Sequence, residues 1–190
     1  MPVKLSVRPL ILAVLSAGLA LAVLYVILSA PVHAPGPPQS LSRLALAKTP
    51  KTLPSVAFSD EEGRRHVLSE FRGRTVLLNL WAPWCAPCVR ELPALAKLSE
   101  RVPPSKLTVI AVDVGRGGVD DARSFLAEHG ASALSVYVDS DIALVRAFGA
   151  YGLPLSVVID PEGREIARSV GPGEWDAPEA IAYMKTLAGG

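Results

Sequence analysis

The chain has 190 residues, of which 19 are Lys or Arg and 18 are Asp or Glu, so its formal net charge is +1. That length accommodates one domain of ordinary size and an additional segment. The balanced charge gives no overall signal for a nucleic acid or an acidic partner, and we expect no nucleic acid among its partners.

The first element is an apolar stretch that predicts a transmembrane signal-anchor at residues 9–30. Leu10–Ala30 is nearly all Leu, Ala, Val and Ile, and no Lys, Arg, Asp or Glu stands between Arg8 and Arg43. In a helix, ~20 such residues cross a hydrocarbon core of ~30 Å. A buried core helix would normally show a polar stripe, which this stretch lacks.

A cleaved signal peptide is the alternative to an anchor. Val32-His33-Ala34 loosely resembles a cleavage site, but Pro35 follows it and the apolar run is longer than a signal peptide needs. We therefore favour the uncleaved anchor. Lys4 and Arg8 predict that residues 1–8 lie in the cytoplasm, which places the rest of the chain on the far side of the membrane.

A proline-rich segment follows and predicts a linker at residues 31–51. Four prolines within residues 31–38 are typical of a stiff, extended spacer. Residues 39–47 have the pattern of a short amphipathic helix before Pro50. The folded domain is therefore expected at residues 52–190.

Within this domain, strand-like runs alternate with helical patterns. The runs 56–59 and 65–68 flank the turn sequence Asp60-Glu61-Glu62-Gly63 and predict a hairpin. Further strands are expected at 75–81, 107–114, 134–138, 155–159 and 165–170, and helices at 85–101, 119–129, 142–148 and 177–187. Together with the N-terminal stretch, they predict an α/β fold with a mixed central sheet flanked by helices, an N-terminal hairpin and a transmembrane helix.

The chain has two cysteines, Cys85 and Cys88, which stand where a buried strand passes into a helix. Unpaired N–H groups and the positive end of the helix dipole stabilise a thiolate at such a place. A free Cys, with a pKa of ~8.5, is mostly protonated at neutral pH. We expect Cys85, exposed at the helix start, to be the nucleophile and the inward-facing Cys88 to resolve the mixed disulfide, so that the pair forms a redox-active disulfide.

Two structural interpretations of the cysteine pair are weaker. A zinc site would lack its other half, because His33, His66 and His129 are single residues far apart in the sequence. A disulfide between residues so close together stabilises the fold by only ~2 kcal/mol in the chain-entropy model. We expect no metal and no cofactor.

The segment Asn79–Pro93, which contains Trp84-Cys85-Ala86-Pro87-Cys88, resembles the active-site segment of the TlpA/ResA-like membrane-anchored thioredoxins. Gly152-Leu153-Pro154 resembles the cis-proline loop of that family, and the resemblance covers about residues 52–187. It implies a thioredoxin-like fold and a periplasmic thiol:disulfide oxidoreductase held at the inner membrane. The implied partners are a membrane thiol carrier as electron donor and disulfide-containing apoproteins, awaiting haem or copper, as substrates.

The resemblance also implies roles for individual residues. Pro154 is the implied cis-proline, and Leu153 in the same loop and Trp84 are expected to contact substrate. Glu91 matches an acidic residue of the haem-pathway members and is implied to influence cysteine ionisation and proton transfer; the ordinary alternative is a solvated helical Glu. Asn79 stands where many soluble thioredoxins have a buried Asp, which favours Glu91 as the acid or base.

Ala86-Pro87 between the cysteines favours a reductant over an oxidant, with cytochrome c maturation and oxidase copper-site assembly as compatible pathways. A copper-binding assembly chaperone is one alternative, and it would need a third soft or imidazole ligand near the cysteines. A thiol peroxidase is the other. Ala82 counts against it, because such peroxidases usually carry a Thr three residues before the reactive Cys.

Overall fold

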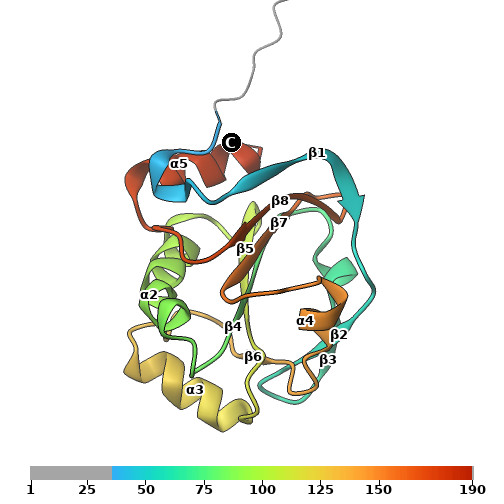
Figure 1. Ribbon diagram of the computed structural model, residues 1–190, viewed down its shortest axis with the longest axis vertical. Coiled ribbons are helices and arrows are strands. Elements are labelled where there is room, and N and C mark those ends of the chain that lie inside the picture. Colours follow the sequence, from blue (N-terminus) through green and yellow to red (C-terminus); the bar gives the residue numbers. More distant parts are fainter. Residues whose placement is uncertain (1–35, 190) are drawn as a thin grey trace, which may run out of the picture. The chain divides into compact units, whose positions relative to one another are not determined.

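The central strand of the fold is β4 (Thr75–Trp81), whose seven residues are all buried. The computed structural model describes residues 36–189. The strands within them form an eight-stranded mixed sheet in the order β1-β8-β7-β4-β5-β6-β2-β3 (Figure 1). A strand covered on both faces has no solvent side, which is why β4 is mostly apolar and shows no alternation of polar and apolar residues.

β4 lies between a parallel and an antiparallel neighbour. β5 (Leu107–Asp113) runs parallel to it, and β7 (Leu155–Ile159) runs antiparallel, with Leu80 opposite Leu155. Parallel strands need a crossover connection, and α2 (Ala86–Arg101) supplies it between β4 and β5. The carboxyl end of β4 and the beginning of β7 therefore meet at the same edge of the sheet.

The remaining strands extend the sheet on either side. β6 (Tyr137–Val138) lies beside β5, and the hairpin of β2 (Ala57–Asp60) and β3 (Arg65–Val67) continues from it. On the other side, β8 (Arg164–Val170) pairs with β7, and β1 (Ala45–Thr52) pairs with β8 at the outer edge. The predicted hairpin is thus confirmed.

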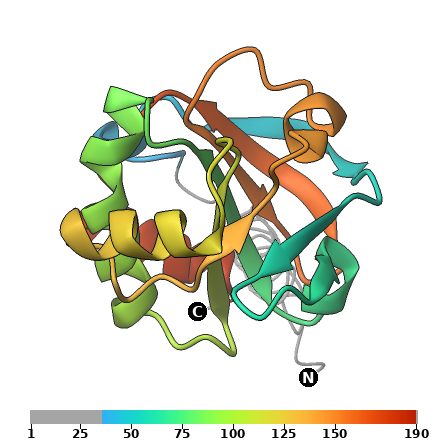
Figure 2. The ribbon, with the colours of Figure 1, turned by 90° about the horizontal axis from the view of Figure 1, so that it is seen from below.

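Helices cover both faces of the sheet (Figure 2). α2, α3 (Val119–Glu128) and α5 (Pro178–Leu187) contribute buried side chains to the hydrophobic cluster on one face, which includes Leu77 of β4. η2 (Leu68–Phe71) and α4 (Ala143–Ala147) contribute to the cluster on the other face. This arrangement confirms the predicted α/β fold with a mixed sheet flanked by helices.

The beginning of the domain differs from the prediction. The linker prediction is wrong for residues 37–51, and so is the helix expected at 39–47, because the compact unit begins at Pro37. A single 3-10 turn, η1 (Gln39–Leu41), is followed by β1, which pairs antiparallel with β8. Most β1 side chains are exposed, so the strand lacks an apolar signature, and an edge strand tolerates its Pro50.

The strand expected at 134–138 is also shorter than predicted. Leu134 and Val136 are buried, yet only Tyr137 and Val138 pair with β5. The N–H of Leu134 instead donates to the carbonyl of Ala131 in a turn. The apolar run therefore indicated burial correctly but not a regular strand, since both environments select the same side chains.

The predicted signal-anchor at 9–30 and cytoplasmic segment at 1–8 lie outside the described residues, as does the first part of the linker, 31–35. Within residues 36–189, we find no helix with the length and apolar character required to cross a membrane.

Candidate active site

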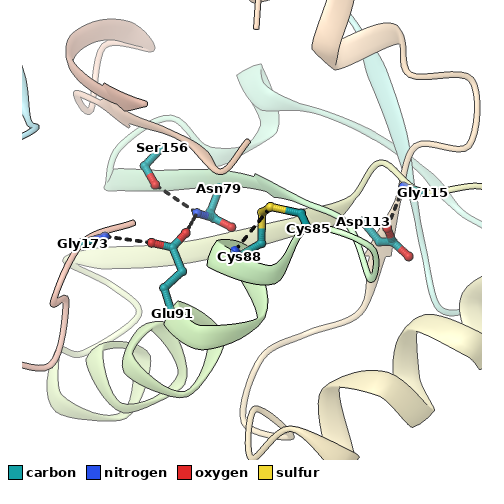
Figure 3. Close-up of a disulfide and its surroundings, with 8 residues drawn as sticks. All are labelled: Asn79, Cys85, Cys88, Glu91, Asp113, Gly115, Ser156 and Gly173. Atoms are coloured by element: carbon teal, nitrogen blue, oxygen red, sulfur yellow. Dashed lines mark hydrogen bonds between the residues drawn. A yellow bond between two sulfur atoms is a disulfide. The ribbon is translucent and has the colours of Figure 1, made fainter. Parts of the chain in front are cut away.

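The two cysteines form a disulfide at the place where β4 gives way to α2 (Figure 3). Cys85 is the N-cap residue of α2, and Cys88 lies in the first turn, with the two Cα atoms 5.3 Å apart. Pro87 also lies in this first turn, where its missing N–H costs no intrahelical hydrogen bond. A buried strand and a helix start thus hold the redox pair on rigid elements.

The start of α2 places an N–H donor and the positive end of the helix dipole near the sulfur of Cys85. The backbone N–H of Cys88 donates to the Cys85 Sγ at 3.3 Å, and no acidic residue stands in the first turn of α2. An N–H donor and the positive end of the helix dipole stabilise a thiolate relative to a thiol. This geometry suits Cys85 for the role of nucleophile once the disulfide is reduced.

The expectation that Cys85 is exposed is wrong for the disulfide form. Cys85 is 6% exposed and Cys88 is fully buried. The sulfur of Cys85 bonds to Cys88 in the first turn of α2, and both cysteines belong to the buried hydrophobic cluster that also contains Trp81 and Ala82. The preceding residue, Trp84, is 73% exposed and presents the accessible apolar surface beside the pair.

Glu91 is a buried carboxyl on the same helix, three residues after Cys88. It is only 3% exposed, which excludes the ordinary interpretation of a solvated helical Glu. Its Oε1 accepts a hydrogen bond from Asn79 Nδ2 at 2.7 Å. Its Oε2 accepts two more, from the backbone N–H of Gly173 at 3.0 Å and from Trp175 Nε1 at 3.1 Å.

Burial raises the pKa of Glu91 from its ordinary 4.5 to about 7, and the hydrogen bonds from Gly173, Asn79 and Trp175 oppose that rise. Desolvation disfavours the charged carboxylate, whereas N–H donors favour it. The result is a carboxyl group that can gain or lose a proton near neutral pH. Residues i and i+3 share one face of a helix, so Glu91 and Cys88 lie on the same side of α2.

Asn79 is fully buried in the centre of β4 and connects Glu91 to β7. Its Nδ2 donates to Glu91 and also to Ser156 Oγ at 2.9 Å (Figure 3). An amide at this position holds Glu91 without adding a second ionisable group. The contact between Asn79 and Glu91 is a finding of the structure, because the sequence indicated only that Asn79 replaces an acidic residue.

The predicted cis-proline loop lies at the same edge of the sheet. The Leu153–Pro154 peptide bond is cis, and Pro154 is buried immediately before β7. Because Leu155 is opposite Leu80 of β4, this loop stands next to the end of the strand that leads to Cys85. Leu153 is partly buried and packs against the cluster that contains both cysteines.

Three polar partners of the site were missed by sequence reasoning. Gly173 and Trp175 lie in the segment after β8, more than 80 residues from Glu91, and no local pattern connects them. Ser156 offered a weak signal, because it is a polar residue in the otherwise apolar run of β7.

A second buried carboxyl belongs to Asp113, the last residue of β5. It lies on the opposite side of the two cysteines from Glu91 (Figure 3). Its Oδ1 accepts a hydrogen bond from the backbone N–H of Gly115 at 2.7 Å, and its Oδ2 has no partner in the described part of the chain. Burial raises the pKa of this carboxyl. Sequence reasoning assigned it no role. We assign it none in the chemistry.

The copper-chaperone alternative calls for three ligands close together. Among residues 36–189, His, Cys, Asp and Glu side chains form no group of three or more that could hold a metal ion. The described part of the chain therefore adds no observation in favour of that alternative.

Comparison with known proteins gives a family and close structural neighbours. The Redoxin family model matches residues 48–184 of this chain. The thiol-disulfide oxidoreductase ResA of Geobacillus thermodenitrificans (strain NG80-2) is 33% identical over 113 residues, which are 60% of this chain and 64% of the relative. ResA of Bacillus subtilis (strain 168) is 30% identical over 113 residues, or 60% of this chain and 62% of the relative.

A solved structure extends the likeness to the fold. The crystal structure of a candidate thiol:disulfide interchange protein DsbE from Chlorobium tepidum matches with a TM-score of 0.64 and 27% identity. The match covers 76% of this chain and 99% of that protein. The fold is therefore thioredoxin-like, whereas the chain spans less than two thirds of the length of the two ResA relatives.

Proposed function

This chain belongs to the Redoxin family, and on that premise we propose that it is a thiol:disulfide oxidoreductase acting through Cys85 and Cys88. The observation that carries the proposal is the Cys85–Cys88 disulfide at the start of α2, with the buried carboxyl of Glu91 on the same helix face. The ResA relatives bear the same activity in their names.

The first step begins from the reduced pair. The Cys85 thiolate, stabilised by the helix start, attacks one sulfur of a substrate disulfide. A bond forms between Cys85 Sγ and that sulfur, and the substrate S–S bond breaks. The other substrate sulfur leaves as a thiolate with the bonding electron pair.

The second step releases the substrate. Cys88 is fully buried, and an apolar environment disfavours its thiolate, so its proton needs an acceptor. Glu91 accepts this proton, and Cys88 then attacks Cys85 Sγ, which breaks the bond to the substrate. The substrate leaves with both electrons. The proton on Glu91 is available to the thiolate released in this step, and the thiolate released in the first step takes its proton from solvent, which completes the dithiol.

Substrate is expected to bind over the edge formed by Trp84 and the Leu153–Pro154 loop. Trp84 supplies an exposed apolar surface beside Cys85. Leu153 lies in the loop before β7 and touches the cluster around the disulfide. A segment of a partially folded protein, with apolar side chains near its disulfide, fits such a surface.

The finer proposal concerns compartment and pathway. We place the catalytic domain on the periplasmic side of the inner membrane, attached through the segment at 9–30, where a membrane thiol carrier regenerates the reduced pair. The substrates would be apoproteins of cytochrome c maturation or of oxidase copper-site assembly. The resemblance of Asn79–Pro93 to the TlpA/ResA-like active-site segment supports this assignment.

A Cys88→Ser variant tests the mechanism and identifies the partner. Without the resolving thiol, the mixed disulfide between Cys85 and its substrate should persist in cells and appear as a band on a non-reducing gel that dithiothreitol removes. The matched control is Cys85→Ser, whose remaining Cys88 is fully buried and should trap nothing. If neither variant, or both equally, formed adducts, the exchange mechanism would be wrong.

A further inference from the structure

The segment between β8 and α5 contributes two of the three hydrogen-bond donors to Glu91. Figure 3 shows the backbone N–H of Gly173 directed at the Glu91 carboxyl, and the indole N–H of Trp175 donates to the same oxygen. We call Asn79, Gly173 and Trp175 the carboxyl-binding site. Two N–H donors on one oxygen are an arrangement suited to a carboxylate rather than to a neutral acid.

Close packing fixes Trp175 in this place. The side chain is fully buried, and a Cβ added at Gly173 would lie 3.0 Å from indole Cε2 and 3.2 Å from Leu41 Cδ2. The N–H of Glu174 also donates to the carbonyl of Ser40 at 3.1 Å. Since neighbouring atoms fill the space, the indole N–H has little freedom to turn away from Glu91.

Another tryptophan shows that packing alone does not require such a bond. Trp81 is also fully buried, but its Nε1 has no hydrogen-bond partner among residues 36–189. The two residues differ in what the indole N–H meets, not in their burial. The N–H of Trp175 is directed to a group that we place in the chemistry.

We propose that Trp175 is a positioning residue of the disulfide exchange, which acts by holding the Glu91 carboxyl on the side of α2 that carries Cys88. The inference rests on the proposed role of Glu91 as proton acceptor. It adds a residue that is 84 positions from Glu91 in sequence, on the segment between β8 and α5.

A cleft of about 300 Å³ lies beside Glu91. The cleft is lined by Glu91 with Arg90, Ala94, Pro172, Gly173, Glu174 and Asp176. The charged side chains of α2 are Arg90, Glu91, Lys97, Glu100 and Arg101, and those of the facing segment are Glu174 and Asp176. Lys97 pairs with Asp176 at 2.9 Å. β4 and β7 contribute the neutral Asn79 and Ser156.

Trp175→Phe in the full chain is the direct test, with Trp81→Phe as the matched control. The pKa of Glu91 is read from the carboxyl carbon resonance of the oxidised protein with ¹³C-labelled Glu. Loss of the donor should raise that pKa by about one unit, a tenfold change in acid dissociation. Trp81→Phe should leave it unchanged. An unchanged Glu91 pKa in Trp175→Phe would overturn the proposal.

A second measurement needs no tryptophan variant to fold. In the wild-type protein, the indole N–H resonance of Trp175 should shift with pH, and the midpoint of that shift should equal the pKa of Glu91. In Glu91→Gln that shift should disappear. If the indole N–H resonance did not change over the pH range in which Glu91 titrates, the hydrogen bond would not act on the carboxyl, and the proposal would be wrong.

The exchange reaction separates a positioning role from a structural one. In Trp175→Phe, the pH profile of the rate of insulin disulfide reduction should shift to higher pH, by the same amount as the pKa of Glu91. If the pKa of Glu91 shifted and the pH profile of insulin reduction did not, the positioning role of Trp175 would be wrong. The Glu91 titration uses the oxidised protein without substrate, so its result can be interpreted even if the protein catalyses no disulfide exchange. An absence of exchange would refute the proposed function and not the role of Trp175.

Discussion

At the scale of single residues, Glu91 connects the chemistry of the site to the stability of the fold. Its pKa is about 7 in the folded chain and has an ordinary value of 4.5. Between these values the folded state binds more protons than the unfolded state. The contribution of Glu91 to the free energy of unfolding is therefore greatest at low pH and is lost as pH rises through this window.

Glu91→Gln should remove that pH dependence. Relative to the variant, wild type should lose about 3 kcal/mol of unfolding free energy between pH 4 and pH 8, at 1.36 kcal/mol per pKa unit. Urea denaturation of the oxidised proteins measures the difference. Glu100→Gln, which changes an exposed residue of the same helix, should follow wild type. Parallel curves for Glu91→Gln and wild type would show that Glu91 does not titrate in this range.

At the scale of elements, the segment from η1 through β1 is part of the domain and not a spacer. Leu41 and Leu44 are buried, and Leu41 lies beside Gly173 of the carboxyl-binding site. The first described residues of the chain thus pack against the segment that holds Glu91. This link follows from the pairing of β1 with β8, because β8 leads directly into that segment.

Truncation of Leu41 should therefore destabilise the domain. Leu41→Ala removes buried methyl groups and should cost about 2–5 kcal/mol of unfolding free energy. Leu46→Ala, a change of the same chemistry at an exposed position on β1, should stay within about 0.5 kcal/mol of wild type. Denaturant titration compares the two. Equal small effects would indicate that η1 does not contribute to the core.

At the scale of the whole molecule, the sheet order brings distant segments to one edge. The end of β4 leads to Cys85, the start of β7 follows Pro154, and the end of β5 carries Asp113. Strand ends of parallel neighbours and starts of antiparallel ones share an edge, so the topology assembles the site. The predicted anchor would hold this assembled domain at the membrane on the periplasmic side.

Cysteine labelling tests that placement. In a Cys85→Ser, Cys88→Ser background the chain has no other cysteine. A membrane-impermeant maleimide should label Glu128→Cys, at an exposed position of α3, in intact spheroplasts. It should label Ser6→Cys, in the predicted cytoplasmic segment, only after detergent is added. The reverse pattern would contradict the proposed topology.

The sequence by itself determined the local features of this protein. The mostly apolar run of β4, the turn after Asp60 and the helix that begins beside Cys85 each depend on neighbouring residues, and all three are confirmed. Local conformation follows local sterics, hydrogen bonding and periodicity, which a short window of sequence contains. The cysteine pair could be recognised for the same reason.

Only the tertiary structure decided what surrounds Glu91 and Cys85. The donors from Gly173 and Trp175 reach Glu91 across 82 and 84 positions of sequence, and β1 exists because β8 pairs with it. Burial and long-range pairing are properties of the packed chain, and a carboxyl pKa depends on both. The candidate nucleophile was therefore visible in the sequence, whereas the environment that controls its proton chemistry was not.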